Sequence, residues 1–222
     1  MKINNNLRKY IEENIFPKYL FNDKGHGIDH INEVIRRSFE LNENLNLNLD
    51  QNIIYTIAAY HDIGKHLNSE IHERISAEFF YRDDEMHKFF NDQQRKTIKE
   101  AIEDHRSSNK NKPRSIYGEL ISSADRNSKI ELVFIRSFLV AHERTPDMII
   151  EDYLDYTFKR LSRRYSEEAH ENMFLEDDKY KKFLIEMRKL LKDEKSFKDK
   201  YCSVNNIKSR MHMVFEEPGV AI

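Results

Sequence analysis

The chain has 222 residues, of which 39% are apolar and 34% charged, and its formal net charge at pH 7 is −2. This length favours one domain of ordinary size, alone or with an appended helical segment. The balanced charge excludes binding of nucleic acid or anionic membrane through the overall charge, so any phosphate-binding surface must be a local cluster. A single cysteine, Cys202, excludes an internal disulfide and a cysteine-rich zinc site.

The N-terminus lacks the apolar core of a secretory signal. No stretch approaches the roughly 18 consecutive apolar residues that a membrane-spanning helix needs. We therefore expect a cytoplasmic protein that has no membrane partner and forms no stable complex with nucleic acid.

Helices are predicted along the whole chain, because only 5 glycines and 4 prolines occur and apolar residues recur at three- and four-residue spacing. The fold class expected is all-α. Asp50 is expected to cap a helix that follows a linker over Leu45–Leu49. In chain order, the first two helices are predicted over Asn4–Asn14 and through Ile31, Val34, Ile35, Ser38 and Leu41. The next three are predicted from Ile53 to a stop at Gly64, over Ile71–Phe80 and from about Asp92 to His105. After a polar loop over Arg106–Pro113, a further helix is predicted through Tyr117, Leu120, Ile121 and Ala124.

The C-terminal part differs in composition. From about Glu143 the chain becomes strongly charged, which predicts a helical core over 1–142 and a charged helical extension over 143–222 that packs on it. Helices are expected over Ile130–His142, Asp147–Arg164 and Asp177–Leu191, whereas the tail over Ser196–Ile222 is weakly patterned. A homodimer through these C-terminal helices is left open; its candidate contacts are Phe158, Phe174, Phe183 and Leu190.

Polar residues stand at positions that should face the protein interior on four predicted helices. His61 lies one turn beyond Ile57, and His30 lies four residues before Val34. Residues at such spacing share one helix face. In the same way, His105 continues the stripe of Ile98, Ala101 and Ile102, and Asp125 follows Ile121 by four residues.

A buried carboxylate without a partner costs several kcal/mol at least. Asp62 and Asp125 therefore need a compensating positive charge, yet no lysine or arginine lies on the same stripes. A divalent cation would compensate both carboxylates and take neutral imidazoles as further ligands; this nitrogen and oxygen donor set suits Mn, Fe, Ni, Zn or Mg. A single inward histidine is more often a hydrogen-bonded core residue. The four residues together favour the metal.

Three motifs in this order resemble the HD superfamily of metal-dependent phosphohydrolases. They are Gly25-His-Gly-Ile-Asp-His30-Ile-Asn-Glu-Val, His61-Asp62-Ile-Gly-Lys65 and Ala124-Asp125-Arg126. The resemblance implies a compact HD-domain helical bundle, here with extra C-terminal helices. It also implies that His30, His61, Asp62 and Asp125 bind the metal. Dinuclear members have two further histidines, for which His72 and His105 are the candidates, so one or two divalent ions are expected.

The function that this resemblance implies is hydrolysis of a nucleotide or other small phosphate ester or anhydride by metal-activated water. Asp62 is the candidate to bridge two ions or orient the water. His72 and His105 either complete a second metal site or contact the phosphate and protonate the leaving group.

Substrate contacts are expected from four further residues, each with an ordinary alternative. Lys65 is a candidate phosphate contact or a cation at a helix C-terminus. His26 either lines the entrance of the site or caps a helix. Arg106 and Arg126 follow two site residues and either supply charge to a phosphate or face solvent.

Two other functions stay open. The first is a metal-containing nucleotide-binding or sensory module that has kept the site without turnover. The second is an oxygen-using di-iron enzyme on the same scaffold. Intact ligand positions favour hydrolysis over the first, because loss of catalysis usually shows as loss of a ligand.

Overall fold

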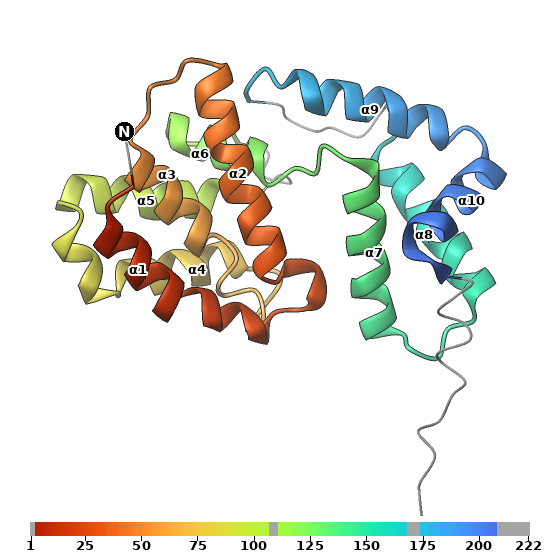
Figure 1. Cartoon of the computed structure of the whole chain (residues 1–222), viewed down its shortest axis with the longest axis horizontal. Coiled ribbons are helices and arrows are strands. Elements are labelled where there is room, and N and C mark those ends of the chain that lie inside the picture. Colours follow the sequence, from red (N-terminus) through yellow and green to blue (C-terminus); the bar gives the residue numbers. More distant parts are fainter. Residues whose placement is uncertain (1–2, 107–110, 168–173, 208–222) are drawn as a thin grey trace, which may run out of the picture. The chain divides into compact units, whose positions relative to one another are not determined.

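The computed structural model describes residues 3–106, 111–167 and 174–207, and these residues form helices and no strand (Figure 1). The prediction of an all-α protein is confirmed. Contacts divide the chain into two compact units, the first of residues 1–127 and 170–178 and the second of residues 128–169 and 179–222. No helix in the described ranges is both long enough and apolar enough to cross a membrane.

The described residues of the first unit form six α-helices and three short 3-10 helices. The α-helices are α1 (Asn5–Asn14), α2 (Ile28–Asn44), α3 (Gln51–Tyr60), α4 (His72–Tyr81), α5 (Asp92–Asp104) and α6 (Ile116–Ala124). The 3-10 helices are η1 (Phe16–Phe21), η2 (Lys24–His26) and η3 (Asp84–Lys88). These short helices were not predicted from the sequence. The third helix was predicted to continue to Gly64, whereas α3 ends at Tyr60.

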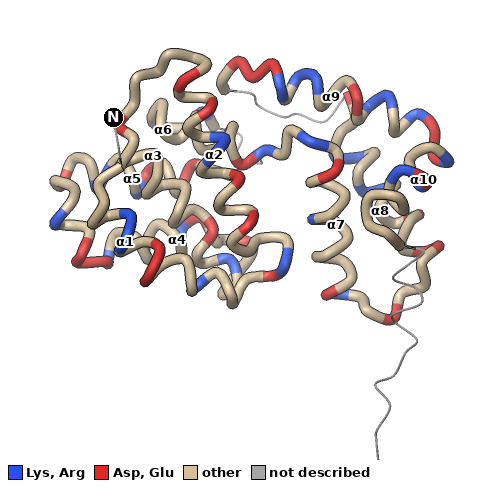
Figure 2. The backbone as a smooth tube through the Cα atoms, in the orientation of Figure 1, with Lys and Arg blue, Asp and Glu red and all other residues tan. Residues whose placement is uncertain are grey.

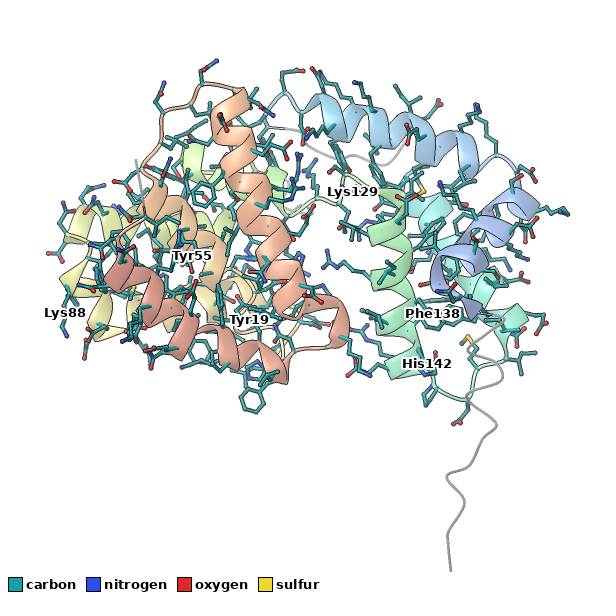
Figure 3. All side chains as sticks on the ribbon, viewed as in Figure 1. Tyr19, Tyr55, Lys88, Lys129, Phe138 and His142 are labelled. Carbon is teal, nitrogen blue, oxygen red and sulfur yellow. The ribbon has the colours of Figure 1, made fainter. Side chains whose placement is uncertain are left out.

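Helix α3 forms the centre of the first unit, because every residue from Ile53 to Tyr60 is buried. Its start is set by Asp50, whose side chain accepts hydrogen bonds from the backbone N–H groups of Asn52 and Ile53, as predicted. Near its other end, Tyr19 of η1 donates a hydrogen bond to the backbone oxygen of Ala59 at 2.8 Å. Tyr19 and Tyr55 are labelled among these helices in Figure 3.

A buried ion pair ties a distant segment to the first unit. Arg37 of α2 is 1% exposed and pairs with Asp177, which is 5% exposed, and with Glu40 at 3.0 Å. Leu175 packs against the apolar core of this unit. The chain therefore returns to α2 just before α9 begins.

The second unit consists of α7 (Ile130–Arg144), α8 (Ile150–Arg164), α9 (Asp178–Leu190) and α10 (Glu194–Asn205). Its core is aromatic: Phe134, Phe197 and Tyr201 are fully buried. The hydroxyl groups of Tyr201 and Ser137 lie 3.0 Å apart. On α7, the rings of Phe138 and His142 stack one turn apart with centroids separated by 5.7 Å (Figure 3). Basic residues outnumber acidic ones along α9, whereas α10 carries both signs (Figure 2).

Helix α10 occupies the first part of the weakly patterned tail from Ser196, for which the sequence left both a partly ordered and a loose structure open. Its apolar residues Phe197 and Tyr201 are four apart and pack in the second unit, so tertiary contacts stabilise a helix of low intrinsic periodicity. Residues 208–222 of that tail, and 107–110 of the predicted polar loop, lie outside the described residues. The boundary of the predicted helical core at residue 142 and the packing of the extension on that core stay predictions.

Candidate metal centre

Helix ends deliver all the predicted ligands. His30 is the third residue of α2, His72 is the first residue of α4, and His61 follows the last residue of α3. A residue at a helix end can turn its side chain across the end of the bundle, where neighbouring helices also terminate. His105 and Asp125 follow the last residues of α5 and α6, and Asp62 follows His61.

The four residues predicted to bind the first ion lie together. His30 Nε2 is 3.1 Å from Asp125 Oδ1 and 3.5 Å from Asp62 Oδ2. His61 Nε2 is 3.8 Å from the same oxygen of Asp125 and 3.6 Å from the same oxygen of Asp62. Residues separated by up to 95 positions in the sequence thus converge on one point.

His72 and His105 join this cluster on its other side. Asp62 Oδ1 lies 3.1 Å from His72 Nε2 and 3.5 Å from His105 Nε2. The two oxygens of the Asp62 carboxylate therefore face two different pairs of imidazoles. Three groups have ligand atoms within 4.8 Å of one another: His30, His61 and Asp62; His61, His105 and Asp125; and Asp62, His72 and His105.

Backbone carbonyl groups orient three of the imidazoles. The Nδ1 atoms of His61, His72 and His105 lie 2.8, 2.9 and 2.7 Å from the backbone oxygens of Ala58, Ser69 and Ile102. A neutral imidazole that donates its Nδ1 proton in this way keeps a lone pair on Nε2. That arrangement fixes the tautomer and ring orientation of a metal-binding histidine.

Burial and charge set unusual protonation states here. Burial lowers the pKa of His61 to about 3, so its imidazole is neutral at physiological pH. Burial alone would raise the pKa of the Asp62 carboxyl, but the neighbouring imidazoles outweigh this effect and hold that pKa well below its ordinary value. The pKa of Asp125 is lowered for the same reason, chiefly by His30. Both carboxylates are ionised.

The donor set fits a divalent cation. His61 is fully buried, His30 is 8% exposed and Asp62 is 2% exposed. Yet His30 Nε2, His61 Nε2 and Asp62 Oδ1 have no hydrogen-bond partner in the described part of the chain. Buried polar atoms are normally satisfied, and an exception calls for a partner of another kind, such as an ion. Neutral imidazole nitrogens and carboxylate oxygens are ligands of borderline and hard divalent ions.

Comparison with known proteins agrees with this geometry. Residues 27–129 match the family model described as the HD domain. This segment is similar to HD domains. The match contains every residue of the cluster and confirms the resemblance to the HD superfamily of metal-dependent phosphohydrolases. No curated protein and no solved structure matches the chain significantly.

The predicted substrate contacts of the HD domain lie at different depths. Lys65 is close, because its Nζ atom lies 3.7 Å from Asp62 Oδ1 and its side chain is only 17% exposed. Arg126 is 7% exposed, beside the ligand Asp125. Arg106 donates to the backbone oxygen of Glu70 and lies 3.5 Å from Glu73 Oε2, so the N-terminal end of α4 holds its guanidinium.

His26 pairs with Asp23 at the edge of the cluster. Its Nδ1 atom lies 2.6 Å from Asp23 Oδ1, and its ring centroid lies 5.7 Å from that of His30. The N-cap of α2 is Gly27 and has no side-chain cap bond, so His26 does not cap this helix. Its proposed place at the entrance stays a prediction.

The sequence did not point to Asn22, whose side chain links the segment before α2 to the loop after Asp62. Its Nδ2 atom donates to the backbone oxygens of Asp62 at 2.9 Å and His26 at 3.1 Å. Its Oδ1 atom accepts from the backbone N–H of His66 at 3.0 Å. No periodic signal marks Asn22, because a loop residue acts here through a partner 40 positions away. The sequence indicates only that Asn22 lies in a turn, because asparagine, aspartate and glycine occur together over residues 22–25.

Proposed function

We propose that this protein is a metal-dependent phosphohydrolase that cleaves a nucleotide or another small phosphate ester or anhydride. One observation carries the proposal: five imidazole or carboxylate side chains and the partly exposed Asp125 surround one point, with the free Nε2 atoms directed inward. The HD domain at residues 27–129 supports it, since this superfamily consists of metal-dependent phosphohydrolases.

The two faces of the Asp62 carboxylate favour two ions over one. His30, His61 and Asp125 stand on the side of Oδ2, and His72 and His105 on the side of Oδ1. A carboxylate whose two oxygens face separate nitrogen pairs is suited to bridge two cations. We therefore assign His30, His61, Asp62 and Asp125 to the first ion and Asp62, His72 and His105 to the second.

A divalent ion bound by these residues would act as a Lewis acid and would lower the pKa of a water molecule toward neutrality. The chain itself contributes orientation and charge. Backbone carbonyls hold the imidazoles of His61, His72 and His105 in fixed orientations. Lys65 places a cation beside Asp62, where a phosphoryl oxygen would need charge balance. Burial keeps bulk water from screening these charges.

Limited access favours a small substrate. His61 and His105 are at most 1% exposed, whereas the Asp125 side chain is 23% exposed and is the most open of the six. A phosphoryl group can approach through such an opening. This depth supports a small molecule as the substrate.

Elemental analysis followed by a phosphate-release panel tests the proposal. The protein should carry a divalent metal and release phosphate from at least one nucleotide or small ester with Mn, Ni, Fe, Zn or Mg. Asp62→Ala should lose both metal and turnover. Asp92→Ala, which removes an exposed carboxylate from the first turn of α5, should keep both. Bound metal without turnover on any substrate would instead favour a binding or sensory module.

A further inference from the structure

Two exposed apolar side chains lie on η1, directly before Asn22, whose side chain donates a hydrogen bond to the backbone oxygen of Asp62. Leu20 is 84% exposed and Phe21 is 71% exposed, although the preceding Tyr19 is buried and anchored to α3. Moving a large apolar side chain out of water lowers the free energy of the protein. Two consecutive exposed apolar side chains on η1 are therefore unfavourable unless a ligand or partner covers them. Phe21 has a specific neighbour: its ring centroid lies 5.6 Å from that of His66, with the planes 37° apart.

Hydrogen bonds fix this ring pair relative to the metal centre. Asn22, the residue after Phe21, donates to the backbone oxygen of Asp62 and accepts from the backbone N–H of His66. The side chain of Asn22 thus connects the segment that carries Phe21 with the segment that carries His66 and with the backbone of Asp62. The position of the pair is set by the loop that carries Asp62.

The turn from Asp62 to His66 carries a metal ligand, a cation and an aromatic ring in that order along the chain. Asp62 is the metal ligand, Lys65 places its ammonium group 3.7 Å from that carboxylate, and His66 carries the exposed ring beside Phe21. A nucleotide has the matching order of phosphate, sugar and planar base. Its phosphate would meet the cation and the metal centre, and its base would reach the ring pair.

Other exposed aromatic rings of the first unit are already covered by cations. Lys18 lies over the ring of Phe79 at 5.7 Å, and Arg95 and Lys99 lie over the ring of Tyr81 at 5.1 and 5.8 Å. Phe21 has no such cation among the described residues, and its ring contact is with His66. Because Phe21 is 71% exposed, part of this ring pair is open to solvent and accessible to a flat ligand.

We propose that Phe21 and His66 form a stacking platform for the planar base of the substrate, which makes the substrate a nucleotide and not a simple sugar phosphate. This inference rests on the proposed phosphohydrolase function, because it concerns the part of the substrate remote from phosphorus. Stacking on an aromatic side chain tolerates any base, since each base has a π-face. The platform therefore favours phosphates that carry a base over phosphates that lack one, without distinguishing one base from another.

A single-tryptophan variant tests the platform without any need for turnover. The chain contains no tryptophan, so Phe21→Trp introduces the only indole. The protein is loaded with Zn²⁺ or Mg²⁺ and titrated with the nonhydrolysable phosphonate analogue of AMP, then with methylphosphonate, which has the same anionic group and no base. Saturable quenching is expected with the first compound and not with the second.

Leu20→Trp is the matched control, because residue 20 is more exposed than residue 21 and has no ring contact in the described part of the chain. Its fluorescence should not show saturable quenching by the AMP analogue. The inference is overturned if Phe21→Trp shows no saturable quenching, or if Leu20→Trp is quenched with the same midpoint.

Kinetics separate this inference from the proposed function. Phe21→Ala should lower kcat/KM for AMP about tenfold relative to kcat/KM for ribose 5-phosphate, mainly through KM. An unchanged ratio overturns the platform and leaves the phosphohydrolase intact. Absence of phosphate release from any substrate by the unmodified protein overturns the proposed function, and the fluorescence experiment then decides the platform by itself.

Discussion

The Nε2 atoms of His72 and His105 lie 3.2 Å apart, although the two residues are 33 positions apart in the sequence. The Nδ1 atom of each ring faces a backbone carbonyl of its own turn. Two neutral imidazoles oriented in this way would bring two lone pairs together, which is repulsive. A proton on His105 or a metal ion bound by the two residues would remove this repulsion, so we expect an exchange of the proton for the metal.

Metal binding should therefore release a proton from this pair. Burial alone would lower the pKa of His105, but Asp62 and Asp125 raise it above its ordinary value, which favours a proton on this imidazole in the metal-free protein. Histidine must lose that proton to bind a metal, so metal affinity should fall as the pH is lowered from 8 to 6. Calorimetry in buffers of different ionisation enthalpy measures the released protons. A metal affinity independent of pH in this range would contradict the exchange.

The number of ions should depend on His105. If Asp62 bridges two ions, the unmodified protein holds two per chain and His105→Ala holds one, because the ligands of the first ion are intact. Elemental analysis at known protein concentration gives this ratio. The control is His142→Ala, which removes an exposed histidine of the second unit and should keep two ions. One ion in both the unmodified protein and His105→Ala would show a single-metal site.

Lys65→Ala should weaken substrate binding more than catalysis. Its ammonium group lies 3.7 Å from Asp62 Oδ1 and is largely shielded from water, so its interaction with a phosphate is stronger than that of a surface lysine. A charge-assisted hydrogen bond contributes about 1.5–3 kcal/mol, so KM should rise about 10- to 100-fold. Lys88, labelled in Figure 3, is 66% exposed on η3, and Lys88→Ala should leave KM unchanged. Steady-state kinetics on both variants decide the matter.

Gly64→Ala should disturb the metal centre by steric conflict. A Cβ atom at Gly64 would lie 2.6 Å from Ile75 Cγ2 and 3.0 Å from the backbone nitrogen of Ser76. The loop after Asp62 would have to move away from α4, which begins with His72, at a cost of about 1–3 kcal/mol. Thermal unfolding and metal titration should show lower stability and weaker metal binding. Gly27→Ala, whose Cβ meets nothing within 4 Å, should bind metal normally.

Arg37→Ala should destabilise the protein much more than Arg36→Ala. Removing Arg37 leaves the 5% exposed carboxylate of Asp177 without its guanidinium, and breaking a buried pair costs about 3–5 kcal/mol. Arg36 is 48% exposed and pairs with Glu33 and Glu40 at the surface, where an ion pair contributes at most about 1 kcal/mol. Denaturant unfolding of the two variants measures the difference. Equal losses would show that the buried pair adds nothing.

The sequence alone determined the helical class and the residues that meet at the site. Both are local properties: periodic apolar residues define helices, Asp50 marks a helix start, and His61 and Asp125 continue apolar stripes toward the interior. The sequence also predicted an interior position for Asp62, beside His61 at the end of an apolar helix. Helix α10 was missed, since its stability comes from packing of Phe197 and Tyr201 in the second unit and not from its own periodicity.

Only the tertiary structure decided which side chains of the site contact one another. The division of the Asp62 oxygens between two imidazole pairs, the approach of His72 to His105 and the link from Asn22 to two loops all depend on helix ends that meet in space. Spacing along one helix specifies which face a residue occupies. It holds no information about the distance to a residue on another helix, which the packing of the whole unit sets.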